Sequence, residues 1–283
     1  MFAPDLLDDR VIVITGGGSG LGAEMARRFA ELGALAVVLG RRQEKIDSVA
    51  AEITGRGRRA AAFACDVRDP DRVAAVADEV TTRFGRVDAL VNNAAGNFLA
   101  TTEDLSPNAF KSVVDIVLGG TFHCTLFFGR KMIARGAGGA MVNIVTTYAW
   151  TGSAFVVPSA AAKAGVLALT RSLAVEWACY GIRLNAIAPG PVPTEGAFSR
   201  LLPEAGLVEK ARNRIPLKRF GKPREIADAA AFLLSDGAGY VTGECLTVDG
   251  GEWLRNGGEF SWGTDYERPD LRRMFLEMRG KGR

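Results

Sequence analysis

The sequence predicts an α/β fold with a doubly wound parallel sheet, and three observations carry this prediction. Short runs of β-branched and apolar residues alternate with longer helical patterns along the 283 residues. These runs are mostly apolar throughout, as in parallel strands that are buried on both faces. A glycine-rich turn at 15–22 lies between the first run and the first helical stretch. With right-handed crossovers, the units form one Rossmann-like domain of about seven strands with helices on both faces.

Each predicted element follows from its local pattern. The predicted strands are short and rich in Val, Ile, Leu and Ala: 11–15, 36–40, 60–65, 89–92, 140–145, 183–188 and 245–248. The predicted helices are longer and have apolar residues at helical spacing: 22–32, 70–84, 107–135, 159–180 and 223–235. Because no linker or change of composition separates these elements, we expect residues 1–283 to form a single domain.

Two segments stand outside the alternation. Residues 191–222 are rich in Pro and Arg and follow the sixth predicted strand, at the sheet edge where ligands bind in open α/β folds. We interpret them as a substrate lid. The tail 252–283 carries aromatic residues and then a basic, helix-like stretch at 271–279. For the tail, docking on a neighbouring subunit or on its own core is favoured over closure across the substrate.

The composition narrows the possible functions. A net charge of +3 is too small for a nucleic-acid-binding surface, although it suits anionic small molecules. The first residues include acids, and the apolar runs look too short for membrane insertion, so we expect a cytosolic (cytoplasmic) protein. Four widely spaced cysteines and a single histidine predict neither a metal site nor disulfides.

The glycine-rich turn is a candidate phosphate site. It fits the pattern T-G-x-x-x-G-x-G, with Gly16, Gly20 and Gly22 as the three glycines. Glycines at these places let the backbone approach a pyrophosphate and present amide groups at a helix N-terminus. Since any tight strand-to-helix turn needs glycine, the pattern alone is only moderately specific.

The end of the second predicted strand indicates which dinucleotide binds. Arg41 and Arg42 follow this strand, where an acid would bind a free ribose diol. Two arginines would instead pair with a 2′-phosphate, which favours NADP(H) over NAD(H). Asp66 and Val67, after the third strand, would flank the adenine, and small residues after Asn93 would let the nucleotide lie close.

Four motifs together resemble the short-chain dehydrogenase/reductase family over nearly the whole chain. They are the glycine turn, NNAAG at 92–96, PGP at 189–191 with Thr194, and DGG at 249–251. The resemblance implies a nicotinamide site made by Gly16, Ser19, Gly20, Leu21, Arg41, Arg42, Asp66, Val67, Asn93, Lys163, Pro189, Gly190, Val192 and Thr194. The family's catalytic serine, tyrosine and lysine positions hold Thr146, Ser159 and Lys163, so the usual tyrosine is absent.

Tyr148 can replace the missing tyrosine. Thr146 and Tyr148 are two residues apart at a predicted strand end, so in an extended chain both side chains point the same way. Ser159 lies one helical turn before Lys163, where its small hydroxyl leaves room for a phenol. We therefore predict that the catalytic phenol comes from the strand end.

One branch of the family shows this arrangement: the segments around Asn97, Tyr148, Ser159 and Arg200 resemble the NADPH-dependent 2,4-dienoyl-CoA reductases. The resemblance implies that Tyr148 and Asn97 donate hydrogen bonds to the thioester oxygen and that Lys163 holds the nicotinamide ribose. Ser159 would support Lys163 or the substrate. The implied acyl-CoA contacts are Arg41, Arg68, Phe98, Ser106 and Arg200.

The leading prediction is reduction of 2,4-dienoyl-CoA to 3-enoyl-CoA in auxiliary β-oxidation by a homotetramer. The long apolar helices at 107–135 and 159–180 would supply the shared interface. Two alternatives stay open. One is a reductase of 2-enoyl-CoA or 3-ketoacyl thioesters, and the other is an NADP-binding regulator without catalytic activity.

Overall fold

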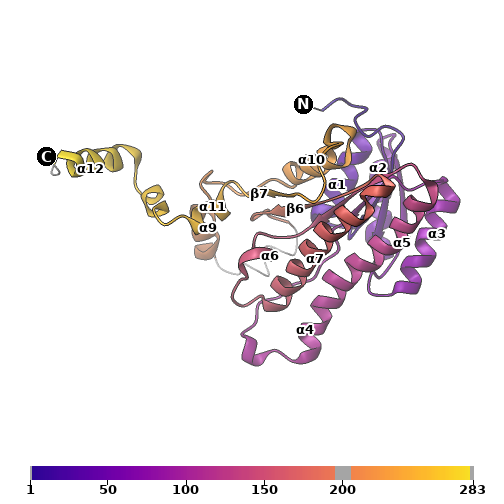
Figure 1. Cartoon of the computed structure of the whole chain (residues 1–283), viewed down its shortest axis with the longest axis horizontal. Helices are drawn as coiled ribbons and strands as arrows, with labels where there is room; N and C mark the ends of the chain where they lie inside the picture. The colour runs from indigo at the N-terminus through magenta and orange to yellow at the C-terminus, as the bar shows by residue number, and fades with distance from the viewer. Residues whose placement is uncertain (1, 195–204, 281–283) are drawn as a thin grey trace.

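A seven-stranded parallel sheet runs through the computed structural model, which describes residues 2–194 and 205–280 (Figure 1). The strand order is β3-β2-β1-β4-β5-β6-β7, with every described pair parallel. The strands are β1 (Val11–Thr15), β2 (Leu35–Gly40), β3 (Arg59–Ala64), β4 (Ala89–Asn92), β5 (Gly139–Ile144), β6 (Ile182–Pro189) and β7 (Cys245–Val248). The predicted doubly wound Rossmann-like fold is confirmed.

Helices cover both faces of the sheet. The α-helices are α1 (Gly20–Glu31), α2 (Gln43–Gly55), α3 (Pro70–Phe84), α4 (Pro107–Val114), α5 (Gly120–Arg135), α6 (Tyr148–Thr151), α7 (Val157–Glu176), α9 (Ala205–Arg214), α10 (Pro223–Leu234), α11 (Glu252–Gly257) and α12 (Arg268–Gly280). Short 3-10 turns lie at Thr102–Asp104, Trp177–Tyr180, Asp236–Ala238 and Ser261–Asp265. Helices α1, α2 and α10 pack on one face, and α3, α5 and α7 pack on the other.

Strand β1 shows why the strand sequences are apolar throughout. Ile12 and Ile14 belong to the core cluster shared with α1, α2 and α10. Val11 and Val13, which alternate with them, belong to the cluster on the other face. Because successive side chains of a strand point to opposite faces, a sheet that is covered on both sides needs apolar residues at every position.

The helix predicted at 107–135 is interrupted. A π-helical segment, Asp115–Gly119, separates α4 from α5. A Cβ atom at Gly120 would lie only 2.4 Å from Val67 Cγ2, so glycine allows α5 to pack closely against the segment after β3. By length and composition the whole run could span a membrane, contrary to the sequence expectation. Its buried residues, such as Phe128, instead pack against the sheet as those of a core helix do.

The C-terminal tail leaves the body of the fold after β7. Figure 1 shows α11 next to α9, and α12 farther out than any other labelled helix. Helix α12 includes the helix-like stretch predicted at 271–279. Leu271 is buried against its own segment near Gly263, and Trp262 makes edge contacts with Tyr266 and Phe275. The outer tail is therefore held together by a small cluster of aromatic side chains.

Asp88, the residue just before β4, ties the start of that strand to β1 and β5, and the carboxyl ends of these three strands carry the candidate site. Its carboxylate accepts hydrogen bonds at 2.8 Å from the backbone N–H of Val11 and from the Arg86 guanidinium, and it also pairs with Arg135. Its backbone carbonyl accepts from Ala140 N–H at 3.0 Å. Burial opposes ionisation of this carboxyl, but the hydrogen bonds from Arg86, Val11 and Arg135 outweigh it and lower the pKa of Asp88.

We expect Asp88→Asn to lower the free energy of unfolding by about 3 kcal/mol, because it leaves the buried end of Arg135 without a counter-charge. Since the pKa of Asp88 is lowered in the folded state, this stabilisation exists above the carboxyl's ordinary pKa and is lost as the pH falls. Urea unfolding at neutral pH measures the difference. Asp78→Asn, which removes an exposed partner of Lys131, is the control and should cost less than about 1 kcal/mol. Equal effects of the two substitutions would contradict the account.

Candidate active site

The glycine-rich turn after β1 has the shape expected of a dinucleotide site. Gly16 and Gly20 have positive φ values of 66° and 54°, which glycine adopts without strain. A Cβ atom at Gly22 would lie 2.4 Å from the Gly16 carbonyl oxygen, so glycine is needed where α1 passes the turn. The bare backbone can therefore approach a pyrophosphate closely.

Asn93 fixes this turn to the end of β4. Its side-chain amide donates to the Thr15 carbonyl oxygen at 3.0 Å, and Thr15 Oγ1 accepts from the backbone N–H groups of Asn93 and Ala94, each at 2.9 Å. Within the described residues, the Ser19 side chain makes no capping hydrogen bond to α1. The first amide groups of α1 are thus available to an anion, which fits the dinucleotide that the motif predicts.

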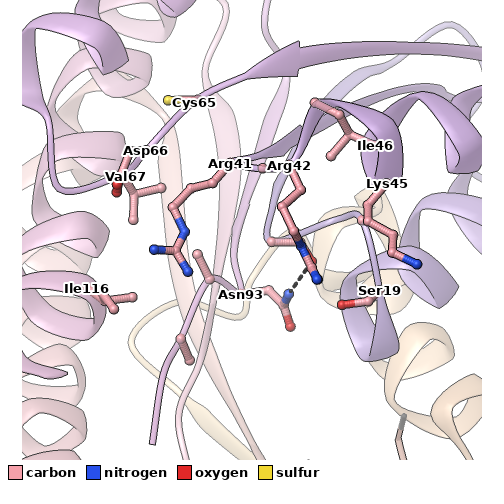
Figure 2. Close-up of a pocket in the computed structure, with 15 residues that line it drawn as sticks. Ser19, Arg41, Arg42, Lys45, Ile46, Cys65, Asp66, Val67, Asn93 and Ile116 are labelled. Carbon is pink, nitrogen blue, oxygen red and sulfur yellow. Dashed lines mark hydrogen bonds between the residues drawn. The ribbon is translucent and has the colours of Figure 1, made fainter. Parts of the chain in front are cut away.

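A cavity of about 260 Å³ continues from this turn across the ends of β2 and β3 (Figure 2). Among its lining residues are these predicted cofactor residues: Gly16, Ser19, Arg41, Arg42, Asp66, Val67 and Asn93. Gly18, Lys45, Ile46 and Ile116 also line it and were not predicted. Lys45 follows Arg42 by three positions on the first turn of α2, so the helical spacing of the two cations could have identified it.

Arg41 and Arg42 point to different sides of the cavity. Figure 2 shows Arg42 on the side of Ser19 and Lys45, whereas Arg41 extends toward Val67. The two guanidinium groups therefore occupy two separate places. Arg42 and Lys45 give the side near the glycine turn a positive charge that suits a phosphate group.

Asp66 and Arg68 form an ion pair at the end of β3. Arg68 Nη2 lies 2.5 Å from Asp66 Oδ2. This hydrogen bond, together with the nearby charge of Arg41, lowers the pKa of Asp66, so the carboxylate is ionised at neutral pH. The Arg68 side chain is 43% exposed, which leaves part of it available to a bound anion.

Three of the four predicted catalytic residues, Tyr148, Ser159 and Asn97, meet beyond the ends of β4 and β5, and the fourth, Lys163, lies one helical turn after Ser159. The Tyr148 hydroxyl oxygen lies 3.1 Å from Ser159 Oγ and 3.5 Å from Asn97 Nδ2. Ser159 is 2% exposed and lies on α7 one turn before Lys163. The phenol therefore stands between the loop after β4 and the helix that carries the lysine.

Tyr148 reaches this position by a different route from the predicted one. The extended chain expected from Thr146 to Tyr148 is wrong, because β5 ends at Ile144 and Thr147 has helical φ and ψ values of −62° and −29°. The Ala149 N–H donates to the Thr146 carbonyl oxygen at 3.0 Å, and this hydrogen bond closes a turn. Tyr148 is thus the first residue of the one-turn helix α6.

Lys163 is buried and carries an altered pKa. It is 6% exposed, and its ammonium group donates to the Ile144 carbonyl oxygen at the end of β5. Burial lowers the pKa of Lys163 from its ordinary value of 10.5 to about 8. Nearby, the buried Thr146 hydroxyl has no hydrogen-bond partner within residues 2–194 and 205–280. An unpaired buried hydroxyl costs free energy, which favours a polar ligand group beside it.

The other predicted cofactor residues lie around the glycine turn and the end of β6. Leu21 and Val192 are partly buried and pack against the hydrophobic core, so their side chains face the core beneath the site. Pro189 is the last residue of β6. The N–H of the following Gly190 donates to the carbonyl oxygen of Val248, the last residue of β7, at 3.0 Å. The Thr194 side chain lies beside the glycine turn.

The predicted acyl-CoA contacts are only partly brought together. Phe98, one residue after the predicted donor Asn97, is partly buried and packs against the core cluster that includes Val145. The Ser106 hydroxyl accepts from the Ala109 N–H at 3.1 Å and so caps α4, which gives it a structural function. Arg200 lies outside the described residues.

The fold and this site together define a class of protein, the oxidoreductases that bind a nicotinamide dinucleotide. Within that class, the chain belongs to the short-chain dehydrogenase/reductase family. A family model described as "Enoyl-(Acyl carrier protein) reductase" matches residues 16–252.

Named relatives support this assignment. A "Probable 2,4-dienoyl-CoA reductase" of Bacillus subtilis (strain 168), described as (2E)-enoyl-CoA-producing, is 47% identical over 249 residues, or 88% of this chain and 98% of the relative. A "Peroxisomal 2,4-dienoyl-CoA reductase" of Danio rerio, described as (3E)-enoyl-CoA-producing, is 44% identical over 255 residues, or 90% and 85%. A solved structure of a putative NAD(P)-dependent gluconate 5-dehydrogenase from Beutenbergia cavernae, with bound NADP, has a TM-score of 0.84 and 37% identity, over 89% and 99% of the two chains.

The lowered pKa of Lys163 predicts how activity depends on pH. Below about pH 8 its amine is charged, and the charge is lost as the pH rises through that value. We therefore expect kcat/KM to fall above about pH 8. In Lys163→Arg, activity should be lower but the fall should be absent, because a guanidinium group stays charged. A wild-type profile that is flat to about pH 10 would contradict this, because it is what a Lys163 with the ordinary pKa of 10.5 would give.

Proposed function

We propose that this protein reduces 2,4-dienoyl-CoA thioesters with NADPH. The observation that carries the proposal is the position of the Tyr148 hydroxyl, between Ser159 and Asn97 and close to the helix face of Lys163. The names of the relatives from Bacillus subtilis and Danio rerio support the same reaction.

The site residues suit the charge that this reaction creates. The nicotinamide cofactor supplies a hydride, which adds to the far end of the conjugated system. Negative charge then develops on the thioester oxygen, and hydrogen-bond donors aimed at that oxygen stabilise the transition state. Tyr148 Oη and Asn97 Nδ2, which are 3.5 Å apart, can both donate to one such oxygen. Ser159 holds the phenol, and Lys163 would hold the nicotinamide ribose when the cofactor is bound.

The moved tyrosine fits conjugated thioester chemistry better than ketone reduction. A ketone reductase must give a proton directly to an alkoxide, whereas a dienolate is delocalised and takes its proton from water at carbon. The phenol therefore acts chiefly as a hydrogen-bond donor, and it need not occupy the usual helix position. We propose the 3-enoyl thioester as product, as in the name of the Danio rerio relative, with the (2E)-enoyl product of the Bacillus subtilis relative's name as the competing outcome.

NADPH is the proposed form of the nicotinamide cofactor. Arg42 and Lys45 lie on the same side of the cavity as Ser19, near the anion-binding turn. A phosphate placed there would meet two cations, which favours a 2′-phosphate over a free ribose diol.

Coenzyme A also carries phosphate groups, and Arg41 and Arg68 are the proposed contacts for them. Phe98 would line the acyl path, and Ser106 and Arg200 complete the proposed set. Because Arg41 points away from Arg42, it is available to a second anion while Arg42 serves the cofactor.

A homotetramer is the proposed assembly. Helices α5 and α7 expose apolar residues, including Phe122 at 47% and Val175 at 81%, and these faces suit contacts between copies of the chain.

Residues 191–222 are the proposed lid, and auxiliary β-oxidation is the proposed pathway. The cytosol is the proposed compartment, with the peroxisome named by the Danio rerio relative as the alternative.

The reaction is tested by following NADPH loss with three thioesters in parallel: a 2,4-dienoyl-CoA, a 2-enoyl-CoA and acetoacetyl-CoA. We expect fast turnover of the dienoyl ester alone. Tyr148→Phe should lower kcat about 100-fold or more with little change in NADPH affinity, because the lost donor acts on the developing charge. Fast turnover of only the ketoacyl ester would overturn the proposal, and NADPH binding without turnover of any thioester would favour a regulator without catalytic activity.

Cofactor choice is tested with Arg42→Ala. Losing a charge-assisted hydrogen bond to the phosphate should raise Kd for NADPH about 10- to 100-fold while Kd for NADH changes little. Arg41→Ala, at the neighbouring position, is the matched control and should affect Kd for NADPH much less. An unchanged NADPH affinity in Arg42→Ala, measured by fluorescence titration, would contradict the assignment.

A further inference from the structure

Tyr148 belongs to a very short helix. Helix α6 is a single turn, Tyr148–Thr151, and is followed by Gly152, which has a φ of 72°. A helix of one turn has no intrinsic stability, so its orientation depends on what packs against it. A phenol on a long helix such as α7 would need no such external support.

Besides the contact of the Tyr148 hydroxyl with Ser159, two side-chain packing contacts hold α6. Ala149 is 7% exposed and packs into the core cluster that includes α7 residues such as Val166. Trp150, the next residue, makes an edge-to-face contact with Trp253, with ring centroids 5.3 Å apart and planes at 88°. Trp253 belongs to α11, in the tail beyond β7. The tail therefore reaches back to the turn that carries the phenol.

Trp253 is itself firmly placed. The Asp249 carboxylate accepts from the backbone N–H of Gly251 at 2.8 Å and of Trp253 at 2.7 Å, which fixes the start of α11 to the end of β7. On the same helix, Glu252 lies 3.9 Å from Arg214 of α9. An aromatic ring on such an anchored helix can restrain its neighbour.

We propose that Trp253 is a positioning residue that holds α6 through Trp150 and so fixes the direction of the Tyr148 phenol. A tyrosine on α7 would be held in place by a long helix, whereas Tyr148 lies on a helix of one turn. The contact from the tail supplies the missing restraint. The match to the family model ends at residue 252, so this support comes from the segment just beyond it. The effect on catalysis rests on the function proposed above.

The experiment compares Trp253→Ala, Trp253→Phe and a control, Trp262→Ala. Trp262 is in the same tail, but its ring contacts are with Tyr266 and Phe275, at 6.0 and 6.5 Å. For each variant we would measure kcat, KM and Kd for NADPH, and record 19F NMR spectra of protein labelled with 3-fluorotyrosine. The chain has four tyrosines, and Tyr148→Phe assigns the resonance of interest.

In Trp253→Ala we expect kcat to fall about 10- to 100-fold, because a displacement of the phenol by about 1 Å is enough for such a loss. Kd for NADPH should stay unchanged, and the Tyr148 resonance should shift or broaden. Trp253→Phe, which keeps an aromatic ring, should recover most of kcat and the resonance. Trp262→Ala should move the Tyr266 resonance but leave kcat and the Tyr148 resonance as in the wild type.

An unchanged Tyr148 resonance in Trp253→Ala would overturn the proposal, whatever the activity. A rise in KM alone, with the resonance unchanged, would show that Trp253 contacts the substrate instead. If the wild-type protein reduces no dienoyl-CoA, the proposed function fails, and the NMR comparison still decides whether Trp253 positions Tyr148. A melting curve for each variant verifies that it is folded. If Trp253→Ala is not folded, Trp150→Ala, which removes the other ring of the same contact, serves as the test variant with the same expected results.

Discussion

The contact between the Tyr148 and Ser159 hydroxyl groups, 3.1 Å apart, is the interaction on which the candidate site depends. It joins the turn after β5 to the buried face of α7, and it exists because a small side chain at 159 leaves space for a phenol. Asn97, from the loop after β4, completes the group at 3.5 Å from the phenol oxygen. Three separate segments thus converge at one point, which the parallel sheet makes possible by bringing their strand ends to the same edge.

Electrostatics divides the site into two regions with different solvation. At one end, Arg42 and Lys45 line an open cavity beside the amides of α1 and give that end a positive charge that suits a phosphate group. At the other end, Lys163 is buried, and its pKa is lowered to about 8 because water no longer stabilises the ammonium group. The first region suits binding of an anion. In the second region, the Lys163 ammonium group is held in one direction by its hydrogen bond to the Ile144 carbonyl oxygen.

The sequence predicts the sheet well because a strand that is buried on both faces has a purely local signature. All seven strands lie within a residue or two of their predicted bounds, and seven predicted cofactor residues line one cavity. Features set by tertiary contacts were not predicted. The π-helical segment Asp115–Gly119 occurs next to the close approach of Gly120 to Val67, and α6 forms where an extended strand end was expected. The contact of Trp150 with Trp253 joins residues 103 positions apart (253 − 150 = 103), a separation that local patterns do not report.

In the proposed site, the phenol of α6 and the amide of Asn97 together bind the thioester oxygen. A crystal structure of the protein with NADP and a 2,4-dienoyl-CoA would show whether they do. We expect the thioester oxygen to lie about 3 Å from both Tyr148 Oη and Asn97 Nδ2, within ordinary hydrogen-bond range. A thioester oxygen that bonds to neither group, and instead faces the Thr146 hydroxyl or solvent, would contradict it.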